Sequence, residues 1–370
     1  MSNYEHEVPR PGEFIQEELD ARGWSQRDLA YILDMDEPGL NKLIKGRYGI
    51  SPDMAKALAR AFDVDDDFFA NLQKAYDIAH AREPDPAIES RARLQSVYPV
   101  REMIRRAWLQ DVDAALMNAQ LARFFRMSND NILEIRHSAK KTNFGEEATP
   151  TQLAWLYRVR QIAEHIHCGP YSWAALEDRM HHLRTLMVEP EEIRHVPQLL
   201  EECGIRLVLV EGLPGGKIDG VCFWLDDKSP VIGMSLRFDR IDNFWFVLRH
   251  ECEHVLREHG RNQEIIDVNL EQTCETISDE EKLANEAATE FLVPQEKMNS
   301  FIVRKSPLFS ERDVVSFAKT MGVHPGIVVG QIQRKTGRWD FLKRLQVKIR
   351  HVITRTAMVD GWGHIAPVQI

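Results

Sequence analysis

The sequence predicts a mainly α protein with one small sheet, an α+β fold in which a five-helix N-terminal domain precedes a larger C-terminal domain. Apolar residues recur at helical spacing along most of the chain. Alternating apolar residues begin near residue 202, where they indicate strands, and helical spacing returns from residue 243. The 370 residues suit two or three domains.

The composition is that of an ordinary globular protein. Charged residues make up 28% and hydrophobic residues 44% of the chain, which is enough to form a core. The net charge of −10 argues against general polyanion binding, so a nucleic-acid contact must come from a local patch. Five cysteines without a CxxC pair indicate reduced thiols. No apolar run reaches about 18 residues and no signal sequence is present, so we expect a cytoplasmic protein without membrane contact.

Changes in composition along the chain predict four regions. Two prolines and scattered charge indicate a linker at 83–90, and a polar stretch at 138–150 interrupts the helical pattern that follows. The predicted regions are a helix-turn-helix domain at 1–82, a helical linker region at 83–200, a second domain at 201–340 and a basic tail at 341–370.

The spacing within residues 25–51 predicts two short helices joined by a tight turn. Ser25 and Asp28 have the spacing of a capping box, which starts the first helix. Residues 34–35 supply the turn, Pro38 suits the first turn of the second helix, and Gly46 ends that helix. Two such helices, the second exposing polar side chains, form the arrangement that places a recognition helix in the major groove of DNA.

Six polar residues of this motif are candidates for DNA contact. Lysine and arginine side chains would anchor phosphates, whereas Asn41 could hydrogen-bond a base edge. The candidates are Gln26, Arg27, Asn41, Lys42, Lys45 and Arg47. Acidic residues oppose this interpretation, because Asp36 and Glu37 open the second helix and residues 1–85 hold eighteen acids against ten bases. The alternative is a protein-binding module whose polar face is only solvated.

Four N-terminal segments also carry a family likeness. They are RPGEFIQEEL (10–19), SQRDLA (25–30), NKLIKGRYGISPDMAKALARAFDV (41–64) and NLQKAYDIA (71–79). Together they resemble the HigA-type antitoxins of the lambda-repressor-like (XRE) helix-turn-helix family. The resemblance implies a five-helix domain that binds operator DNA as a homodimer and regulates its own synthesis.

A small sheet is predicted between residues 202 and 237. Residues 205–210 alternate as a strand, and GLPGG (212–216) forms a turn. Residues 220–225 and 230–237 then predict a hairpin. Two roles are open for this hairpin: an edge strand that binds an extended substrate by strand addition, or simple completion of the sheet on which the next helix packs.

The sequence His250-Glu251-Cys252-Glu253-His254 predicts a metal site. Histidines four residues apart lie on one helix face, so His250 and His254 can both reach one Zn²⁺. Glu251 lies beside them, where it can act as the general base that takes a proton from the attacking water. The alternative is a pair of solvated or core histidines, because so short a pattern also arises by chance.

The third zinc ligand has two candidates. His259 lies about 140° around a continuing helix from His254, so it would need a break in the helix. The alternative comes from a second predicted helix at 279–294, where Glu281 and Asn285 lie one turn apart. A glutamate on a following helix resembles the arrangement that completes the site in the glutamate-zincin class. We therefore predict Glu281 as the third ligand and Asn285 as its support from one turn away.

Three C-terminal segments carry a second family likeness. They are SPVIGMSLRFDRIDNFWFVLRHECEH (229–254), ANEAATEFLVP (284–294) and FAKTMGVHPGIVVGQIQ (317–333). Together they resemble the ImmA/IrrE metallopeptidase family, which implies a zincin-like α+β domain with bound zinc that cleaves a specific regulatory protein. Cys252 and Glu253 stand where this family usually has an apolar residue and a glycine. These departures leave the predicted zinc ligands intact but put the catalytic efficiency of the peptidase in question.

Two further patterns have less specific interpretations. The helices expected around 310–320 and 327–333 could form a second DNA-binding unit, although packing against the catalytic core explains them better. His165, His167, His181 and His182 lie in the preceding helical region and could hold a second metal ion.

Three functions fit these patterns. The first is a DNA-binding regulator, antitoxin-like, whose zinc endopeptidase domain cleaves a regulatory protein. The second is an antitoxin and autorepressor whose peptidase-like half is a non-catalytic scaffold that binds a toxin or senses a signal. The third is a peptidase whose N-terminal module only recruits protein substrates.

Overall fold

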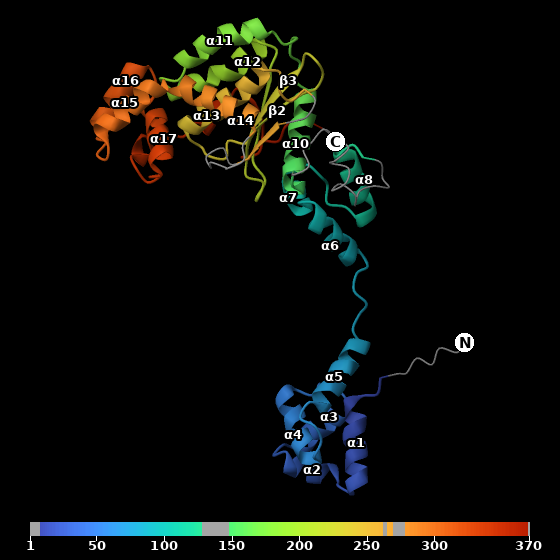
Figure 1. Cartoon of the computed structure of the whole chain (residues 1–370). Coiled ribbons are helices and arrows are strands. Elements are labelled where there is room, and N and C mark those ends of the chain that lie inside the picture. The colour runs from blue at the N-terminus through green and yellow to red at the C-terminus, as the bar shows by residue number, and fades with distance from the viewer. Residues whose placement is uncertain (1–7, 128–147, 262–264, 269–277, 369–370) are drawn as a thin grey trace. The chain divides into compact units, whose positions relative to one another are not determined.

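The chain divides into two compact units, which we describe separately. The computed structural model describes residues 8–127, 148–261, 265–268 and 278–368, so most of the polar stretch at 138–150 lies outside the described residues. Unit 1 spans Met1–Pro86 and unit 2 spans Ala87–Ile370. The fold is mainly α with one small sheet, as the sequence predicts, and the sheet belongs to unit 2 (Figure 1).

Unit 1 is a bundle of short helices around its own apolar core (Figure 1). Its helices are α1 (Pro11–Arg22), α2 (Gln26–Ile32), α3 (Glu37–Ile44), α4 (Pro52–Phe62) and α5 (Phe68–Ala79). The predicted capping box between Ser25 and Asp28 is present at the start of α2. Asp34 takes a left-handed conformation (φ 50°) in the turn between α2 and α3, which aspartate tolerates better than most residues.

Helices α1 and α3 of unit 1 approach each other closely at Gly12. A Cβ atom on Gly12 would lie 2.0 Å from the backbone oxygen of Ile44, the last residue of α3. Glycine is therefore required at this position, because any side chain would push the two helices apart.

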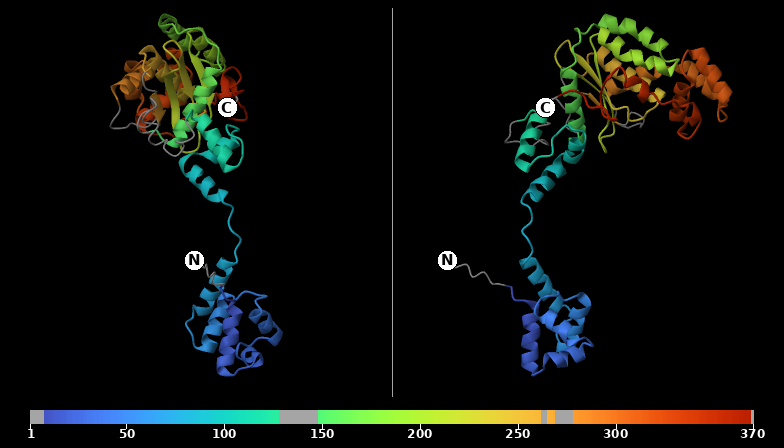
Figure 2. Two further views of the ribbon diagram at one scale, coloured as in Figure 1. Left: turned by 90° about the vertical axis from the view of Figure 1, so that its right-hand side faces the viewer. Right: turned by 180° about the vertical axis from the view of Figure 1, so that it is seen from behind.

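Unit 2 gathers helices around a five-stranded sheet (Figure 2). Before the sheet come α6 (Ala87–Val97), α7 (Val100–Arg105), α8 (Ala114–Phe124), α10 (Pro150–Glu164), α11 (Trp173–Thr185), η2 (Pro190–His195) and α12 (Val196–Glu202). The strands are β1 (Arg206–Val210), β2 (Ile218–Trp224), β3 (Pro230–Met234), β4 (Ile265–Val268) and β5 (Met358–Asp360). The remaining helices are α13 (Ile241–Leu256), α14 (Asp279–Leu292), α15 (Gln295–Lys305), α16 (Glu311–Met321), α17 (Pro325–Thr336), η3 (Lys343–Leu345) and α18 (Arg350–Ile353).

The strand order of the sheet is β4-β2-β3-β1-β5. Strand β2 pairs antiparallel with β3 and β4, whereas β1 pairs in parallel with β3 and β5. Leu207 and Leu209 of β1 belong to the core shared with α12 and α13, while Val208 and Val210 belong to the core shared with α10. Helices thus cover both faces of the sheet, which explains why β1 is apolar at nearly every position.

The sheet differs from the sequence-based expectation in three respects. The hairpin of β2 and β3 forms as predicted, but it lies inside the sheet, so neither of its strands is the edge strand that we considered for substrate binding. The region 83–200, expected to be a linker, contributes α10 to one face of the sheet. The region 341–370, expected to be a basic tail, supplies β5, the edge strand beside β1.

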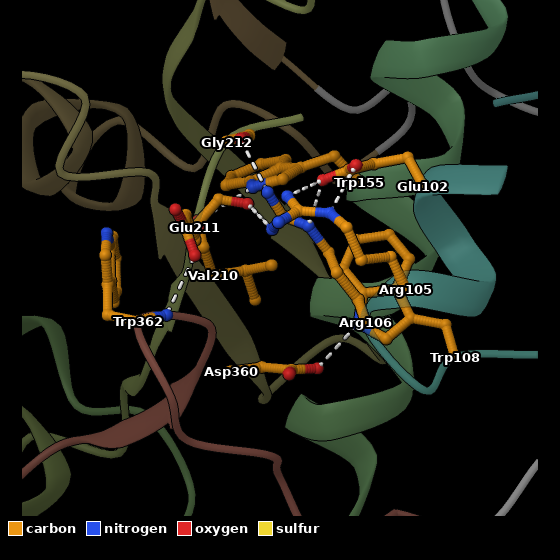
Figure 3. Close-up of polar contacts among 10 residues, drawn as sticks. All are labelled: Glu102, Arg105, Arg106, Trp108, Trp155, Val210, Glu211, Gly212, Asp360 and Trp362. Carbon is orange, nitrogen blue, oxygen red and sulfur yellow. Dashed lines mark hydrogen bonds and ion pairs between the residues drawn. The ribbon is translucent and has the colours of Figure 1, made fainter. Parts of the chain in front are cut away.

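A cluster of polar contacts fastens β5 to the helices that precede the sheet (Figure 3). The carboxylate of Asp360 accepts a hydrogen bond of 3.0 Å from the indole nitrogen of Trp108 and forms an ion pair with Arg158. Both partners of this ion pair are almost completely buried, with side chains 1% and 2% exposed. Nearby, Arg106 of the segment after α7 donates to the backbone oxygens of Glu211 and Gly212, which follow β1 (Figure 3).

Candidate functional site

Helix α13 carries the predicted metal motif and is buried along nearly its whole length. It packs across β2 and β3 on one side and against α14 and α17 on others. Phe244, Trp245 and Phe246 of this helix belong to the hydrophobic core of unit 2. The motif is therefore held on a rigid element rather than on a loop, which fixes the directions of its side chains.

Two histidines of α13 and one glutamate of α14 converge on a single point. The Nε2 atoms of His250 and His254 lie 3.0 Å apart. Glu281 places one carboxylate oxygen 3.3 Å from His250 Nε2 and the other 3.3 Å from His254 Nε2. Both histidines are fully buried, and the Glu281 side chain is 21% exposed. Sequence reasoning named these three residues, and the structure brings them together.

The three side chains lie close enough together to hold one zinc ion. Zinc bonds of about 2.0–2.1 Å separate neighbouring ligand atoms by about 3.3 Å in tetrahedral geometry. The Nε2–Nε2 separation of 3.0 Å is close to this value, and each Glu281 oxygen lies 3.3 Å from one of the two rings. Two imidazoles and one carboxylate are also the ligand set of catalytic zinc sites, which keep a fourth position open. In the described part of the chain, no other group of histidine, cysteine and acidic residues has such spacing.

The first turn of α14 positions Glu281. The side chain of Ser278 caps the helix by accepting a hydrogen bond of 3.2 Å from the backbone nitrogen of Glu281. The positive end of the helix dipole favours a carboxylate here. Burial alone raises the pKa of Glu281, but the hydrogen bonds and charges of His250 and His254 outweigh it, so the pKa lies well below its usual range.

Glu251 is fully buried between α13 and the sheet. A Cβ atom on Gly220 of β2 would lie 1.9 Å from the Oε1 atom of Glu251 and 3.0 Å from Val247. The strand also has an irregular register between Ile218 and Gly220. Glycine at this position therefore makes the space that the Glu251 carboxylate occupies. Sequence reasoning missed Gly220, because a glycine within a strand carries no chemistry of its own.

His259 contacts the metal cluster from outside. Helix α13 ends at Leu256, and Glu258 takes a left-handed conformation (φ 57°) that turns the chain back. This helix break brings Nδ1 of His259 to 3.1 Å from Nδ1 of His254, on the opposite side of that ring from Nε2. The Nε2 atom of His259 lies 4.0 Å from the exposed carboxylate of Glu280. His259 thus supports His254 and does not face the metal position.

Asn285, Cys252 and Glu253 lie near the three candidate ligands in the sequence, and none of them is a fourth ligand candidate in the structure. Asn285 lies one turn after Glu281, but its buried Oδ1 has no hydrogen-bond partner within the described residues, so the support that we predicted for Glu281 is not visible. Cys252 is buried, and burial raises the pKa of its thiol to about 12. Glu253 forms ion pairs with Arg249 and Arg257 (2.7 and 2.6 Å), so its charge is neutralised within the helix.

The predicted DNA-contacting residues lie around α2 and α3 of unit 1. Arg27, Lys42, Lys45 and Arg47 are exposed. The side chain of Asn41 donates a hydrogen bond of 3.0 Å to Gln26, which ties the two motif helices together. The ammonium group of Lys42 lies 5.7 Å from the ring centroid of Tyr48, an exposed aromatic residue that the sequence argument did not include.

Two alternative sites find no support in the described residues. His165, His167, His181 and His182 do not form a metal-binding group with one another or with described acids or cysteines. Helices α16 and α17 pack on each other, and α17 packs on α13, so this pair belongs to the core of unit 2, as the packing alternative predicts. None of the described helices combines the length and the apolar character needed to cross a bilayer.

Comparison with known proteins matches the N-terminal motif. The family model for helix-turn-helix domains matches residues 15–69, which include α2, α3 and α4. Virulence-associated protein A′ of Dichelobacter nodosus is 37% identical over 76 residues, 20% of this chain and 66% of that relative. The uncharacterized HTH-type transcriptional regulator YddM of Escherichia coli K12 is 33% identical over 73 residues, 20% of this chain and 78% of that protein. Virulence-associated protein I of Dichelobacter nodosus is 34% identical over 86 residues, 22% of this chain and 80% of that protein. By its N-terminal domain, the chain belongs to the helix-turn-helix family.

Proposed function

We propose that the chain is a DNA-binding transcriptional regulator whose unit 2 is a zinc-dependent endopeptidase. The observation that carries the enzymatic part is the convergence of His250, His254 and Glu281, whose side chains lie close enough together to hold one metal ion. The substrate that we propose is a specific regulatory protein, in keeping with the resemblance of this half to the ImmA/IrrE family.

Each residue of the proposed peptidase site would have its own role. His250, His254 and Glu281 would hold the ion, which supplies Lewis acidity that polarises a peptide carbonyl and activates water. Glu251 would act as general base, taking a proton from the attacking water and passing it to the leaving amine. Its carboxylate is fully buried beside the histidines, so it is held in place on the rigid helix. Gly220 holds the space for that carboxylate.

Replacing Glu251 by Gln tests the peptidase. We expect this change to remove the general base while keeping the shape of the site, so zinc should still bind and cleavage of the partner protein should fall by at least about a hundredfold. The measurement is proteolysis of candidate repressor proteins by zinc-loaded full-length protein, with zinc content determined in parallel. The matched control is Glu253→Gln on the same helix, which should cleave normally. Equal cleavage by Glu251→Gln and the unmodified chain would exclude this mechanism.

The DNA-binding part rests on the helix-turn-helix match and on four exposed basic side chains around α2 and α3. The name of YddM, a transcriptional regulator, supports the same role. The affinity must come from this local patch, because acids outnumber bases in unit 1. We further propose that the chain binds its operator as a homodimer, since operators of such proteins are paired half-sites.

Lys42→Ala and Arg47→Ala test the DNA surface. Each change removes a phosphate contact, so we expect weaker binding of the full-length protein to the DNA upstream of its own gene. The slope of log affinity against log salt should fall by about one unit for each change. Lys74→Ala on the exposed side of α5 is the control and should bind normally. Binding that is insensitive to salt and to all three changes would leave unit 1 as a protein-binding module.

A second candidate function is an antitoxin whose unit 2 is a protein-binding scaffold. The excess of acids in unit 1 and the two departures at Cys252 and Glu253 favour it. In that case Glu251→Gln leaves neutralisation of the toxin and repression of the promoter intact. A growth assay with the adjacent toxin gene, if one exists, distinguishes the two functions.

A further inference from the structure

A strongly basic stretch of unit 2, residues 334–355, contributes no ligand to the metal cluster. It holds eight lysines and arginines and one acid, in a chain whose net charge is −10. The rest of the chain therefore carries an even larger excess of acids. A local reversal of charge of this kind is typical of a surface that binds a polyanion in an otherwise acidic protein.

The residues between α17 and α18 fold back along α17, and we call them the return segment (337–349). Gln333, near the end of α17, donates a hydrogen bond of 2.6 Å to the backbone oxygen of Phe341. Gln346 donates one of 3.2 Å to the backbone oxygen of Gly326, near the start of the same helix. The return segment thus runs antiparallel to α17 for a length of about 10 Å.

Further contacts hold the return segment at both ends. The backbone oxygen of Val347 accepts a hydrogen bond of 3.1 Å from the backbone nitrogen of Ile241, at the start of α13. At the other end, the ring centroid of Phe341 lies 5.8 Å from that of Phe309. The guanidinium carbon of Arg338 lies 4.9 Å from the Phe341 centroid. A segment held in this way keeps its side chains in fixed positions along α17.

Three basic side chains of the return segment are exposed and form no ion pair within the described residues, namely Arg338, Lys343 and Lys348. The fourth, Arg344, forms an ion pair with Glu311 of α16. Carboxylates are plentiful in this acidic chain, yet none of the described ones compensates these three charges. The return segment therefore presents a strip of uncompensated positive charge along α17.

We propose that the return segment binds the phosphate backbone of double-stranded DNA, as a second and sequence-independent DNA contact of the chain. B-DNA carries one negative charge per about 1.7 Å of its axis, so a length of about 10 Å presents about six phosphates to the three cations. Each phosphate neutralised by lysine or arginine releases condensed counterions, which strengthens binding without reading the sequence. The proposal rests on the DNA-binding role proposed for unit 1, where acids outnumber bases and additional cationic contacts would raise the affinity.

A triple variant of the full-length protein, Arg338→Ala with Lys343→Ala and Lys348→Ala, tests the return segment. The probes are the DNA upstream of the chain's own gene and an unrelated duplex of the same length. We expect the affinity for both duplexes to fall by the same factor, at least about tenfold at low salt. The slope of log affinity against log salt should fall by about two to three units, because up to three phosphate contacts are lost.

Two controls separate the position of the charges from their number and from folding. The first removes three exposed charges elsewhere in unit 2 and should bind both duplexes nearly as the unmodified chain does; its changes are Arg93→Ala, Arg101→Ala and Lys228→Ala. The second exchanges arginine for lysine, and lysine for arginine, at the three positions of the return segment. It keeps the charge and should retain most of the affinity.

The outcomes distinguish this proposal from the role of unit 1. Alanine changes in the return segment that act no more than the first control would overturn the proposal and leave unit 1 as the DNA-binding part. A charge-preserving variant that binds as weakly as the alanine variant would also overturn it, because the loss would then be structural. Weakened binding of poly-L-glutamate with unchanged DNA binding would assign the strip to an acidic protein instead. If Lys42→Ala and Arg47→Ala have no effect while the return-segment variant abolishes binding, the return segment holds and the role of unit 1 fails.

Discussion

The tautomer of a metal-binding histidine depends on what its second ring nitrogen contacts. If His254 binds zinc through Nε2, its Nδ1 keeps the proton and donates it to Nδ1 of His259, 3.1 Å away. His259 then carries its own proton on Nε2, which faces the carboxylate of Glu280. The sequence alone argued against His259 as a ligand, and its contact with His254 assigns it a supporting role.

His259→Ala should weaken zinc binding by about 10- to 100-fold, because it removes the acceptor that orients His254. His259→Asn should recover part of this loss, since its amide oxygen can accept the same proton. Zinc affinity is measured by competition with a chromophoric chelator. His182→Ala on the exposed side of α11 serves as the comparison and should bind zinc as the unmodified chain does. An unchanged affinity in His259→Ala would show that His254 needs no such support.

At the scale of elements, the contact between α1 and α3 controls the placement of the recognition helix. Gly12→Ala inserts a methyl group 2.0 Å from the backbone oxygen of Ile44, so the helices must separate. We expect a loss of about 1–3 kcal/mol in the free energy of unfolding of unit 1 and weaker DNA binding. Denaturant unfolding followed by circular dichroism measures the first effect, and a DNA titration the second. Glu17→Ala, on the exposed side of α1, should leave DNA affinity unchanged, and the same result for Gly12→Ala would contradict the argument.

Elements with strong local patterns could be predicted from the sequence. The capping box of α2, the hairpin of β2 and β3, and the helix that carries His250 and His254 all have signals within about twenty residues. Strand β5 was missed, because three residues are too few to show a period and its partner β1 lies about 150 residues earlier. The packing of α10 on the sheet could not be predicted either, because it is a contact between segments far apart in the sequence.

The residues of the candidate site also fall into two groups, those that the sequence predicts and those that only the folded structure reveals. His250, His254 and Glu281 could be named because ligand chemistry and helical spacing are visible in the sequence, although zinc binding itself stays a prediction. Gly220 could not be named, because its importance arises only when β2 lies against Glu251. The support expected from Asn285 depends on side-chain orientation, which spacing along a helix does not determine.

At the scale of the whole molecule, each unit has its own hydrophobic core. The core of unit 1 draws on α1–α5 and on Ile50 between α3 and α4, whereas the cores of unit 2 combine helices from both ends of its sequence. We therefore expect two separate unfolding transitions, because the residues of each core come from one unit only.

Asp360→Asn should destabilise unit 2 without affecting unit 1. The change leaves the buried guanidinium of Arg158 without its counter-charge, which costs about 3–5 kcal/mol in comparable buried pairs. In urea unfolding of the full-length chain, only the transition of unit 2 should move. The control is Glu164→Gln on the same helix as Arg158, which breaks a half-exposed ion pair with Arg126 and should cost less than about 1 kcal/mol. Equal shifts for both variants would show that the Asp360 cluster does not anchor β5.

The space that Gly220 leaves for Glu251 also determines where inactivating mutations should occur. If unit 2 is the peptidase that we propose, a forward genetic screen for loss of proteolysis should recover changes at the proposed zinc ligands and at Glu251. It should also return codon 220 repeatedly, because every missense change there adds at least a β-carbon where a carboxylate oxygen stands. Substitutions of Gly220, which has no role in metal binding or proton transfer, should therefore inactivate the proposed peptidase as substitutions of Glu251 do.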